Sequence, residues 1–120
     1  TATPSRQPLF KSEWVQPGTH ISCMGTDGLG KQELDPELAR RAELFCDLKT
    51  QSVSIGEFQH ISAEIASGSI RLTQIGDVLT GAAKGRSNPQ AITVFDSSGI
   101  SLQDLHIANC ILQACNSSAQ

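Results

Sequence analysis

The apolar residues of this sequence gather in short runs that are separated by segments with helical periodicity. Three runs predict strands, because they are rich in β-branched or aromatic residues and flanked by turn or cap residues: Thr19–Met24, Leu44–Leu48 and Ala91–Phe95. Thr1–Thr3 match the end of a fourth strand, since the chain opens without a cap or turn. Strands that are apolar almost throughout are typical of a parallel sheet buried on both faces.

Helix signals lie between these strands. Asp35–Glu37 combine an N-cap, a proline at the first helical position and an acid near the positive helix end, which predicts a short helix that stops near Ala42. Ser54–Glu57 has capping-box spacing and Gly68 offers a stop, with apolar residues at helical spacing between them. A third, brief helix is predicted over Thr73–Thr80.

The last predicted helix, Ser101–Cys115, is the most amphipathic segment. Apolar residues cover about half of its circumference, which is wide for a surface helix, so it should pack firmly against another element. Gly81–Gln90 is a loop by composition. Strands alternate with helices and no hairpin signal occurs, which predicts an α/β fold.

Composition narrows the class of protein. The chain has 120 residues, 38% of them hydrophobic and 18% charged, as expected for a single globular domain. A net charge of −3 with scattered basic residues argues against nucleic acid as a partner. No apolar run reaches the roughly 20 residues that span a bilayer, and Pro4–Gln7 interrupt any signal peptide, so we expect no membrane association.

The four cysteines lack CxxC spacing and lie in strand-like or helix-like runs, so we expect buried free thiols in a cytoplasmic protein: Cys23, Cys46, Cys110 and Cys115. No pair of the three histidines has metal-ligand spacing. We therefore expect no metal site.

Two loops follow predicted strands and carry unusual chemistry. Gly25–Lys31 places an acid, Asp27, and a base, Lys31, among three glycines, so it could bind a polar substrate or transfer a proton. Asp96–Gly99 precedes the last helix and offers hydroxyls where a helix N-terminus can bind an anion or a carboxamide. Ligands bind beyond the carboxyl ends of parallel strands, where both loops lie.

Each loop also has a plain structural interpretation, and spacing alone leaves both open. The first can be a glycine-rich turn with a solvated acid and base. The second can be an ordinary helix cap, with Ser98 or Ser101 as the capping residue and Asp104 completing a box.

No GxGxxG motif stands at a strand-to-helix turn, so the phosphate-binding part of a dinucleotide fold is missing. Together with the abrupt opening of the chain, this predicts a C-terminal piece of a longer protein.

Four segments, read in order, resemble the C-terminal half of the ornithine cyclodeaminase and mu-crystallin family. They are TATPSR, VQPGTHISCMGTDGLGKQELDPEL, QSVSIGEFQ and GRSNPQAITVFDSSGISLQDL, and their intervals also agree. The resemblance implies that residues 1–99 are the second half of a Rossmann-like, doubly wound parallel sheet that binds NAD or NADP. It implies that residues 100–120 form a helix returning to an absent substrate and dimerisation domain.

The resemblance also implies an oxidoreductase or cyclodeaminase, a homodimer that acts on a small amino or imino acid. Ornithine conversion to proline with loss of ammonia, and pyrroline-2-carboxylate reduction, are the two reactions it favours. Asp27 matches the catalytic acid/base and Ser98 a substrate contact. The remaining matches are cofactor contacts: Thr3, Met24, Gly25, Thr26, Lys31 and Ser97.

A carboxylate beside the nicotinamide is chemically coherent, because an amine that loses hydride from its carbon must also lose a proton from its nitrogen. Two alternatives remain: a mu-crystallin-type binder of NADP and a small ligand, and a catalytically idle subunit. The acid at Asp27 argues against the binder, which could dispense with it.

We expect no turnover from this chain alone, because the glycine motif and the basic substrate clamp of the family are absent from it. A fluorescence titration with NAD(P)H checks this, and tight binding by the 120-residue chain would contradict it.

Overall fold

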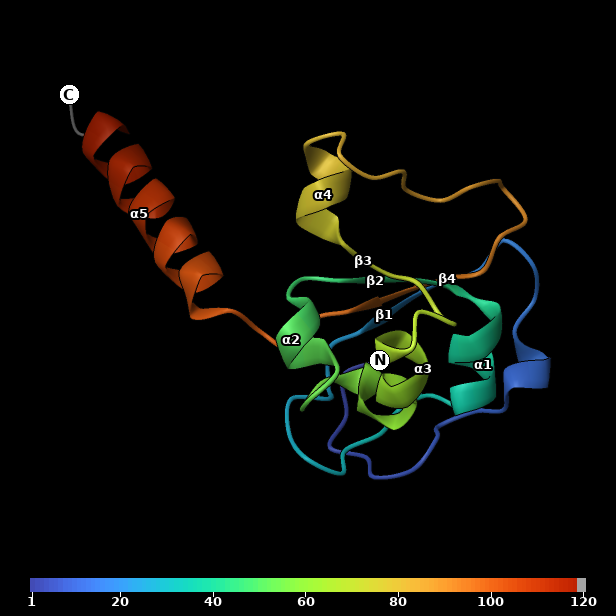
Figure 1. Cartoon of the computed structure of the whole chain (residues 1–120). Helices are drawn as coiled ribbons and strands as arrows, with labels where there is room; N and C mark the ends of the chain where they lie inside the picture. The colour runs from blue at the N-terminus through green and yellow to red at the C-terminus, as the bar shows by residue number, and fades with distance from the viewer. Residues whose placement is uncertain (119–120) are drawn as a thin grey trace.

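Residues 1–118 are described by a computed structural model of the protein. They form a four-stranded parallel sheet with the order β1-β4-β2-β3 (Figure 1). The elements in chain order are η1 (Ser12–Trp14), β1 (His20–Cys23), α1 (Pro36–Arg41), β2 (Glu43–Cys46), α2 (Lys49–Ser52), η2 (Glu57–Ile61), α3 (Ser62–Ala66), β3 (Leu72–Gln74), α4 (Ile75–Leu79), β4 (Thr93–Asp96) and α5 (Ser101–Ser118). The predicted α/β class and parallel sheet are confirmed.

The helices cover the two faces of the sheet unequally. The connections from β1 to β2 and from β2 to β3 run in one direction across the sheet, and the connection from β3 to β4 runs back. Because crossovers are right-handed, connections that run in opposite directions lie on opposite faces. Accordingly α1 and α3 lie on one face and α4 on the other (Figure 1). This reversal makes the sheet doubly wound, as predicted.

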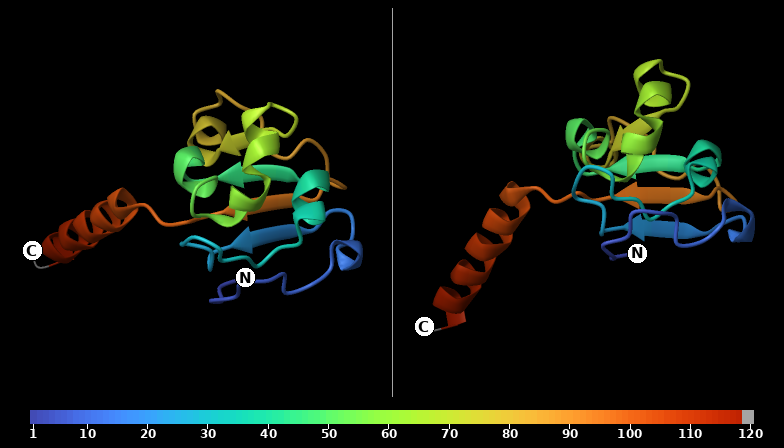
Figure 2. Two further views of the ribbon diagram at one scale, coloured as in Figure 1. Left: turned by 60° about the horizontal axis from the view of Figure 1, so that its bottom comes forward. Right: turned by 90° about the horizontal axis from the view of Figure 1, so that it is seen from below.

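The hydrophobic core lies between the sheet and the face covered by α1, η2 and α3. Its buried members are Cys23, Leu34, Leu38, Ala39, Leu44, Cys46, Phe58, Ile61, Ile65, Leu72, Ile92 and Val94. The expected burial of every strand on both faces is wrong for β1, in which His20 and Ser22 are exposed. That strand lies at the edge of the sheet (Figure 2) and receives no helix on its second face.

Several helix signals are confirmed. The Asp35 carboxylate accepts a hydrogen bond from the Glu37 amide at 3.0 Å, and Pro36 occupies the first position of α1. Gly68 has a φ of +79° just after α3, and Gly81 has a φ of +81° just after α4. Such left-handed positions favour glycine, so both residues end their helices as expected.

Other predictions are wrong. Thr73 and Gln74, predicted as helical, belong to β3, because they pair with the buried residues Phe45 and Cys46 of β2, and α4 begins only at Ile75. Long-range pairing therefore overrides the helical pattern at the start of the predicted helix 73–80. No strand is assigned to residues 1–3, although the Thr1 backbone exchanges two hydrogen bonds with the β1 edge, one to Ser22 O at 2.7 Å and one from Met24 N at 2.9 Å.

The helix α5 projects away from the sheet (Figures 1 and 2), and residues 101–117 are all exposed. Five large apolar side chains lie on it without cover from the rest of the described chain: Leu102, Leu105, Ile107, Ile111 and Leu112. Cys110 and Cys115 are exposed with them, so the expectation of burial holds only for Cys23 and Cys46. Residues 119–120 of the predicted C-terminal segment lie outside the described part of the chain.

Gly56 marks a close approach beneath the sheet. A Cβ there would lie 2.3 Å from Asp96 Oδ2 and 2.7 Å from the backbone atom Ser52 Cα. We expect Gly56→Ala to lower the free energy of unfolding by about 1–3 kcal/mol, as overpacking does. Gly76→Ala is the control, because nothing lies within 4 Å and the helix α4 favours alanine. Urea unfolding measures both, and equal effects would contradict the prediction.

Candidate functional site

The two predicted loops meet at the carboxyl ends of β1 and β4. These strands are neighbours, with Cys23 opposite Asp96 at their last pair. The Ser97 amide continues the pairing with a hydrogen bond to Cys23 O at 3.0 Å. The carboxyl edge of an open parallel sheet is where ligands bind. The structure therefore joins the Asp27 loop and the Ser97–Ser98 segment into one candidate site.

Asp27 lies on the outer surface of this site. Its carboxylate is 2.5 Å from Lys31 Nζ, and its side chain is 60% exposed. The same ammonium donates to Gly25 O at 3.3 Å, so Lys31 closes the loop as well as pairing with the acid. The hydrogen bond from Lys31, and then its charge, hold the pKa of Asp27 below its usual value. Asp27 is therefore a carboxylate that can accept a proton.

Gly25 lets the loop approach the N-terminal segment closely. A Cβ at this position would lie 2.4 Å from both Thr3 N and Thr3 O. Between the two segments lies Glu33, whose carboxylate accepts hydrogen bonds from Thr3 N at 2.6 Å, Thr1 Oγ1 at 2.7 Å and Gly25 N at 3.2 Å. Burial raises the pKa of Glu33, but these hydrogen bonds outweigh burial and the net shift is downward. Glu33 thus binds Thr3 and Gly25 together as an ionised group.

Glu57 holds the next residue of the loop. Its buried carboxylate accepts from Thr26 Oγ1 at 2.5 Å, from Leu34 N at 2.8 Å and from Glu33 N at 3.1 Å. Burial raises the pKa of Glu57 by more than these hydrogen bonds lower it, so the net shift is upward. The capping box predicted for Ser54–Glu57 is therefore wrong. Glu57 reaches into the core, and Gly56 is the residue before η2.

Ser97 and Ser98 differ in their surroundings. Ser97 Oγ donates to Asp47 Oδ2 at 2.9 Å. Ser98 is 8% exposed, and its buried hydroxyl finds no hydrogen-bond partner among the described residues. The interpretation of Ser98 as a helix cap is therefore wrong, since a capping hydroxyl bonds the first amides of the helix. A buried hydroxyl without a partner costs free energy, which favours a ligand that completes it.

The remaining predicted site residues border the same edge. Met24 is 53% exposed and Thr26 is buried. The Thr3 backbone lies close to Gly25, and its amide donates to Glu33. All eight predicted residues thus gather at one end of the sheet. Glu33 and Glu57 were not predicted, because a buried acid and a solvated acid look alike in a sequence. The apolar neighbours Ile55 and Phe58 were the one signal that Glu57 is buried.

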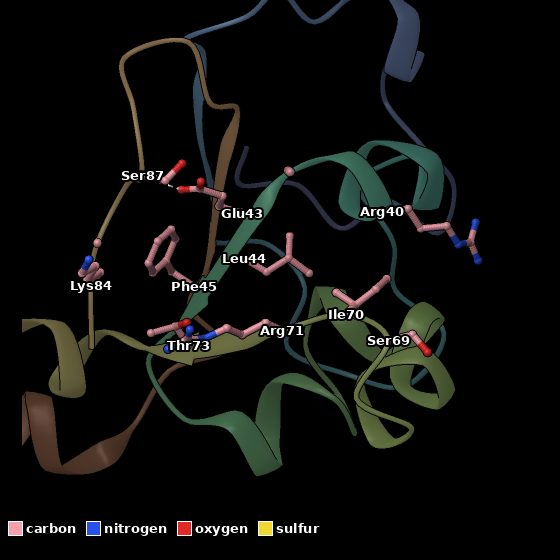
Figure 3. Close-up of a pocket in the computed structure, with 12 residues that line it drawn as sticks. Arg40, Glu43, Leu44, Phe45, Ser69, Ile70, Arg71, Thr73, Lys84 and Ser87 are labelled. Atoms are coloured by element: carbon pink, nitrogen blue, oxygen red, sulfur yellow. Dashed lines mark hydrogen bonds between the residues drawn. The ribbon is translucent and has the colours of Figure 1, made fainter. Parts of the chain in front are cut away.

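A hollow lies at the other end of the strands (Figure 3). Its volume is about 420 Å³, and its lining includes Arg40, Glu43, Arg71, Lys84 and Ser87. These residues precede or begin β2, β3 and β4, so the hollow lies at the amino ends of the strands. Open α/β sheets bind ligands at the carboxyl ends, and we therefore do not assign the site there.

Residues 1–118 contain no group of three or more His, Cys, Asp or Glu arranged to hold a metal ion. The helices in this part of the chain are too short or too polar to cross a bilayer.

The chain belongs to the ornithine cyclodeaminase/mu-crystallin family, whose model matches residues 1–119. Iminosuccinate reductase of Paracoccus denitrificans is 47% identical over 114 residues, which are 92% of this chain and 34% of that protein. Alanine dehydrogenase of Archaeoglobus fulgidus is 40% identical over 117 residues, covering 94% of this chain and 35% of the relative. The chain thus spans about a third of the length of these relatives.

Solved structures agree in fold. The iminosuccinate reductase of Paracoccus denitrificans in complex with NAD+ superposes with a TM-score of 0.86 at 44% identity, over 98% of this chain and 36% of that one. The Δ1-pyrroline-2-carboxylate reductase of Thermococcus litoralis, in complex with NADH and L-proline, has a TM-score of 0.74 at 32% identity, over 86% of this chain and 32% of that one. The Rossmann-like fold expected from the resemblance is confirmed by these structures.

Asp96 gives the site a measurable pH dependence. Burial raises its pKa to about 7, against hydrogen bonds from the Ser52 hydroxyl and the Glu57 backbone. Between about pH 4 and pH 7, Asp96 therefore keeps its proton in the folded state but has lost it in the unfolded chain. As a result, the contribution of Asp96 to the free energy of unfolding falls as the pH rises, by at most about 1.4 kcal/mol per pH unit. We expect the stability of Asp96→Asn, relative to the wild type, to increase across this range in urea unfolding. A difference independent of pH would contradict it.

Proposed function

We propose that the full-length protein is an NAD(P)-dependent oxidoreductase or cyclodeaminase that acts on a small amino acid or cyclic imino acid. The observation that carries the proposal is Asp27, an ionised and exposed acid at the carboxyl edge of the sheet, held between Gly25 and Lys31. Relatives of the same family that are named as dehydrogenases and reductases support the reaction type. Ornithine cyclisation to proline and reduction of pyrroline-2-carboxylate are the reactions we favour.

The residues at the edge of the sheet fit a dinucleotide. Glu33 accepts from the Gly25 amide and Glu57 from the Thr26 hydroxyl, and the Ser98 hydroxyl is buried without a partner among the described residues. Thr3, Met24, Gly25, Thr26, Lys31 and Ser97 would line the cofactor, and Ser98 would contact the substrate. When bound, NAD(P) exchanges hydride with the substrate carbon that bears nitrogen.

Asp27 handles the proton of the reaction. In the oxidising direction, the substrate nitrogen forms a double bond to carbon and releases a proton, which the Asp27 carboxylate accepts. In the reducing direction the protonated acid returns it to the nitrogen. Lys31 lowers the pKa of Asp27 and so favours the proton-accepting form. Asp27 is exposed in this chain, and a covering second domain would shield it from bulk water.

The second domain is part of the proposal. The apolar side chains of α5 are exposed, as expected of a helix at residues 100–120 that returns to a substrate and dimerisation domain. The full-length protein would then be a cytoplasmic homodimer. The basic clamp for the substrate carboxylate would come from that domain.

A mu-crystallin-type binder of NADP and a small ligand is the alternative. It uses the same fold but has no need of a proton acceptor at position 27. The presence of the acid Asp27 favours the enzyme over the binder.

Asp27→Asn in the full-length protein tests the proposal. Because the amide cannot accept the proton, we expect kcat to fall by at least about a hundredfold, in line with the usual contribution of an acid/base group. NADH binding, measured by fluorescence, should change little. Ornithine and alanine are assayed with NAD+ or NADP+, and pyrroline-2-carboxylate and iminosuccinate with NADH or NADPH. Unchanged turnover by the variant would exclude Asp27 as the acid/base, and wild-type binding without turnover would favour the binder.

A further inference from the structure

We propose that η2 braces the Asp27 loop from below, with Glu57 and Gln59 as positioning residues for the acid/base. The proposal rests on the function proposed above and adds residues to it. In the sequence, QSVSIGEFQ contributed a helix signal and one segment of the family resemblance, and no site residue was predicted within it. In the structure, its side chains contact the loop instead.

Glu57 fixes the side of the loop that precedes Asp27. One carboxylate oxygen accepts from the Thr26 hydroxyl at 2.5 Å, and both receive backbone amides of the segment that ends the loop, Glu33 and Leu34. Each of these partners is a donor, so every hydrogen bond here needs an oxygen of Glu57 as its acceptor. Thr26 itself is wholly buried, so its hydroxyl has no access to water as a substitute.

Gln59 fixes the side that follows Asp27. Its Oε1 accepts from Gly30 N at 2.9 Å, and its Nε2 donates to Gly28 O at 3.2 Å. The amide group thus matches one donor and one acceptor of the loop backbone, a pairing that neither a carboxylate nor an alkyl side chain can reproduce. His60 adds a ring nitrogen 2.8 Å from Lys31 O.

Asp27 lies between these two attachments. Among the described residues, Lys31 is the side chain that bonds the Asp27 carboxylate, and the Lys31 carbonyl lies 2.8 Å from a ring nitrogen of His60. The direction of the carboxylate therefore depends on the two residues that flank it, Thr26, whose hydroxyl is held by Glu57, and Gly28, whose carbonyl is held by Gln59. Misplacing a reacting group by about 1 Å can cost about a hundredfold in rate. The brace acts through Asp27 and touches neither substrate nor cofactor.

The test uses full-length Glu57→Gln, which keeps the size of the side chain but replaces one accepting oxygen with a donor. We expect kcat to fall by roughly 10- to 100-fold while KM and the NADH dissociation constant stay within about threefold. Gln59→Ala should act in the same direction, more weakly. Glu64→Gln is the matched control, because Glu64 pairs with Arg40 on the surface of α3, and it should leave kcat unchanged.

Thr26 supplies an independent arm. Thr26→Val removes the hydroxyl and should lower kcat as Glu57→Gln does, whereas Thr26→Ser should restore most of that loss. The kcat of the double variant Glu57→Gln/Thr26→Val should lie within about twofold of that of the less active single variant. The reason is that both substitutions remove the same hydrogen bond, from the Thr26 hydroxyl to Glu57. If Glu57→Gln does not yield folded protein, the Thr26 pair decides the matter alone.

Two results would overturn the proposal. One is a kcat for Glu57→Gln within twofold of wild type. The other is a loss of kcat matched by equal losses in NADH affinity and folded fraction, which a purely structural role would produce. Asp27→Asn is assayed alongside: if it remains active, the proposed function itself fails, and if it is inactive while Glu57→Gln is active, only the brace is wrong.

Discussion

The site depends on the hydrogen bonds that two buried carboxyl groups, Glu33 and Glu57, accept from the surrounding chain. A buried charge is costly unless hydrogen-bond donors surround it, and each carboxylate here accepts from three groups. They are linked, because the backbone amide of Glu33 donates to Glu57 while its side chain binds Thr3 and Gly25. The N-terminal segment, the loop and η2 are thereby held as one unit at the edge of the sheet.

The order of the strands supplies the second half of the site. The strand β4 is the last in the chain, yet it lies between β1 and β2. This insertion brings Ser97 and Ser98 beside a loop that lies some seventy positions earlier in the sequence, through the pairing of Cys23 with Asp96. A connection that returned on the other edge would have separated the two loops. The reversal that makes the sheet doubly wound is thus also what assembles the site.

The parts of the molecule differ in how far they are buried. The core beneath the sheet is closed around Phe58, whereas His20 and Ser22 of β1 and residues 101–117 of α5 are exposed in the described chain. The same is true of Asp27, whose carboxylate has only Lys31 as a side-chain partner. The Asp27 loop is therefore hydrogen-bonded on the side of Glu33 and Glu57 and exposed at Asp27 itself, which agrees with the proposed function.

The sequence by itself determined the local features of this protein. The strands, the Asp35 cap, the glycine stops and the two loops follow from short-range patterns of side-chain type, and the four matching segments indicated the family. Only the tertiary structure decided that β3 is a strand, that Ser98 is not a cap and that Glu57 belongs to the Asp27 loop. The reason is physical: the first and third outcomes depend on partners more than 20 residues away, and the second depends on the burial of the Ser98 hydroxyl. A pattern of neighbouring residues carries no information about either.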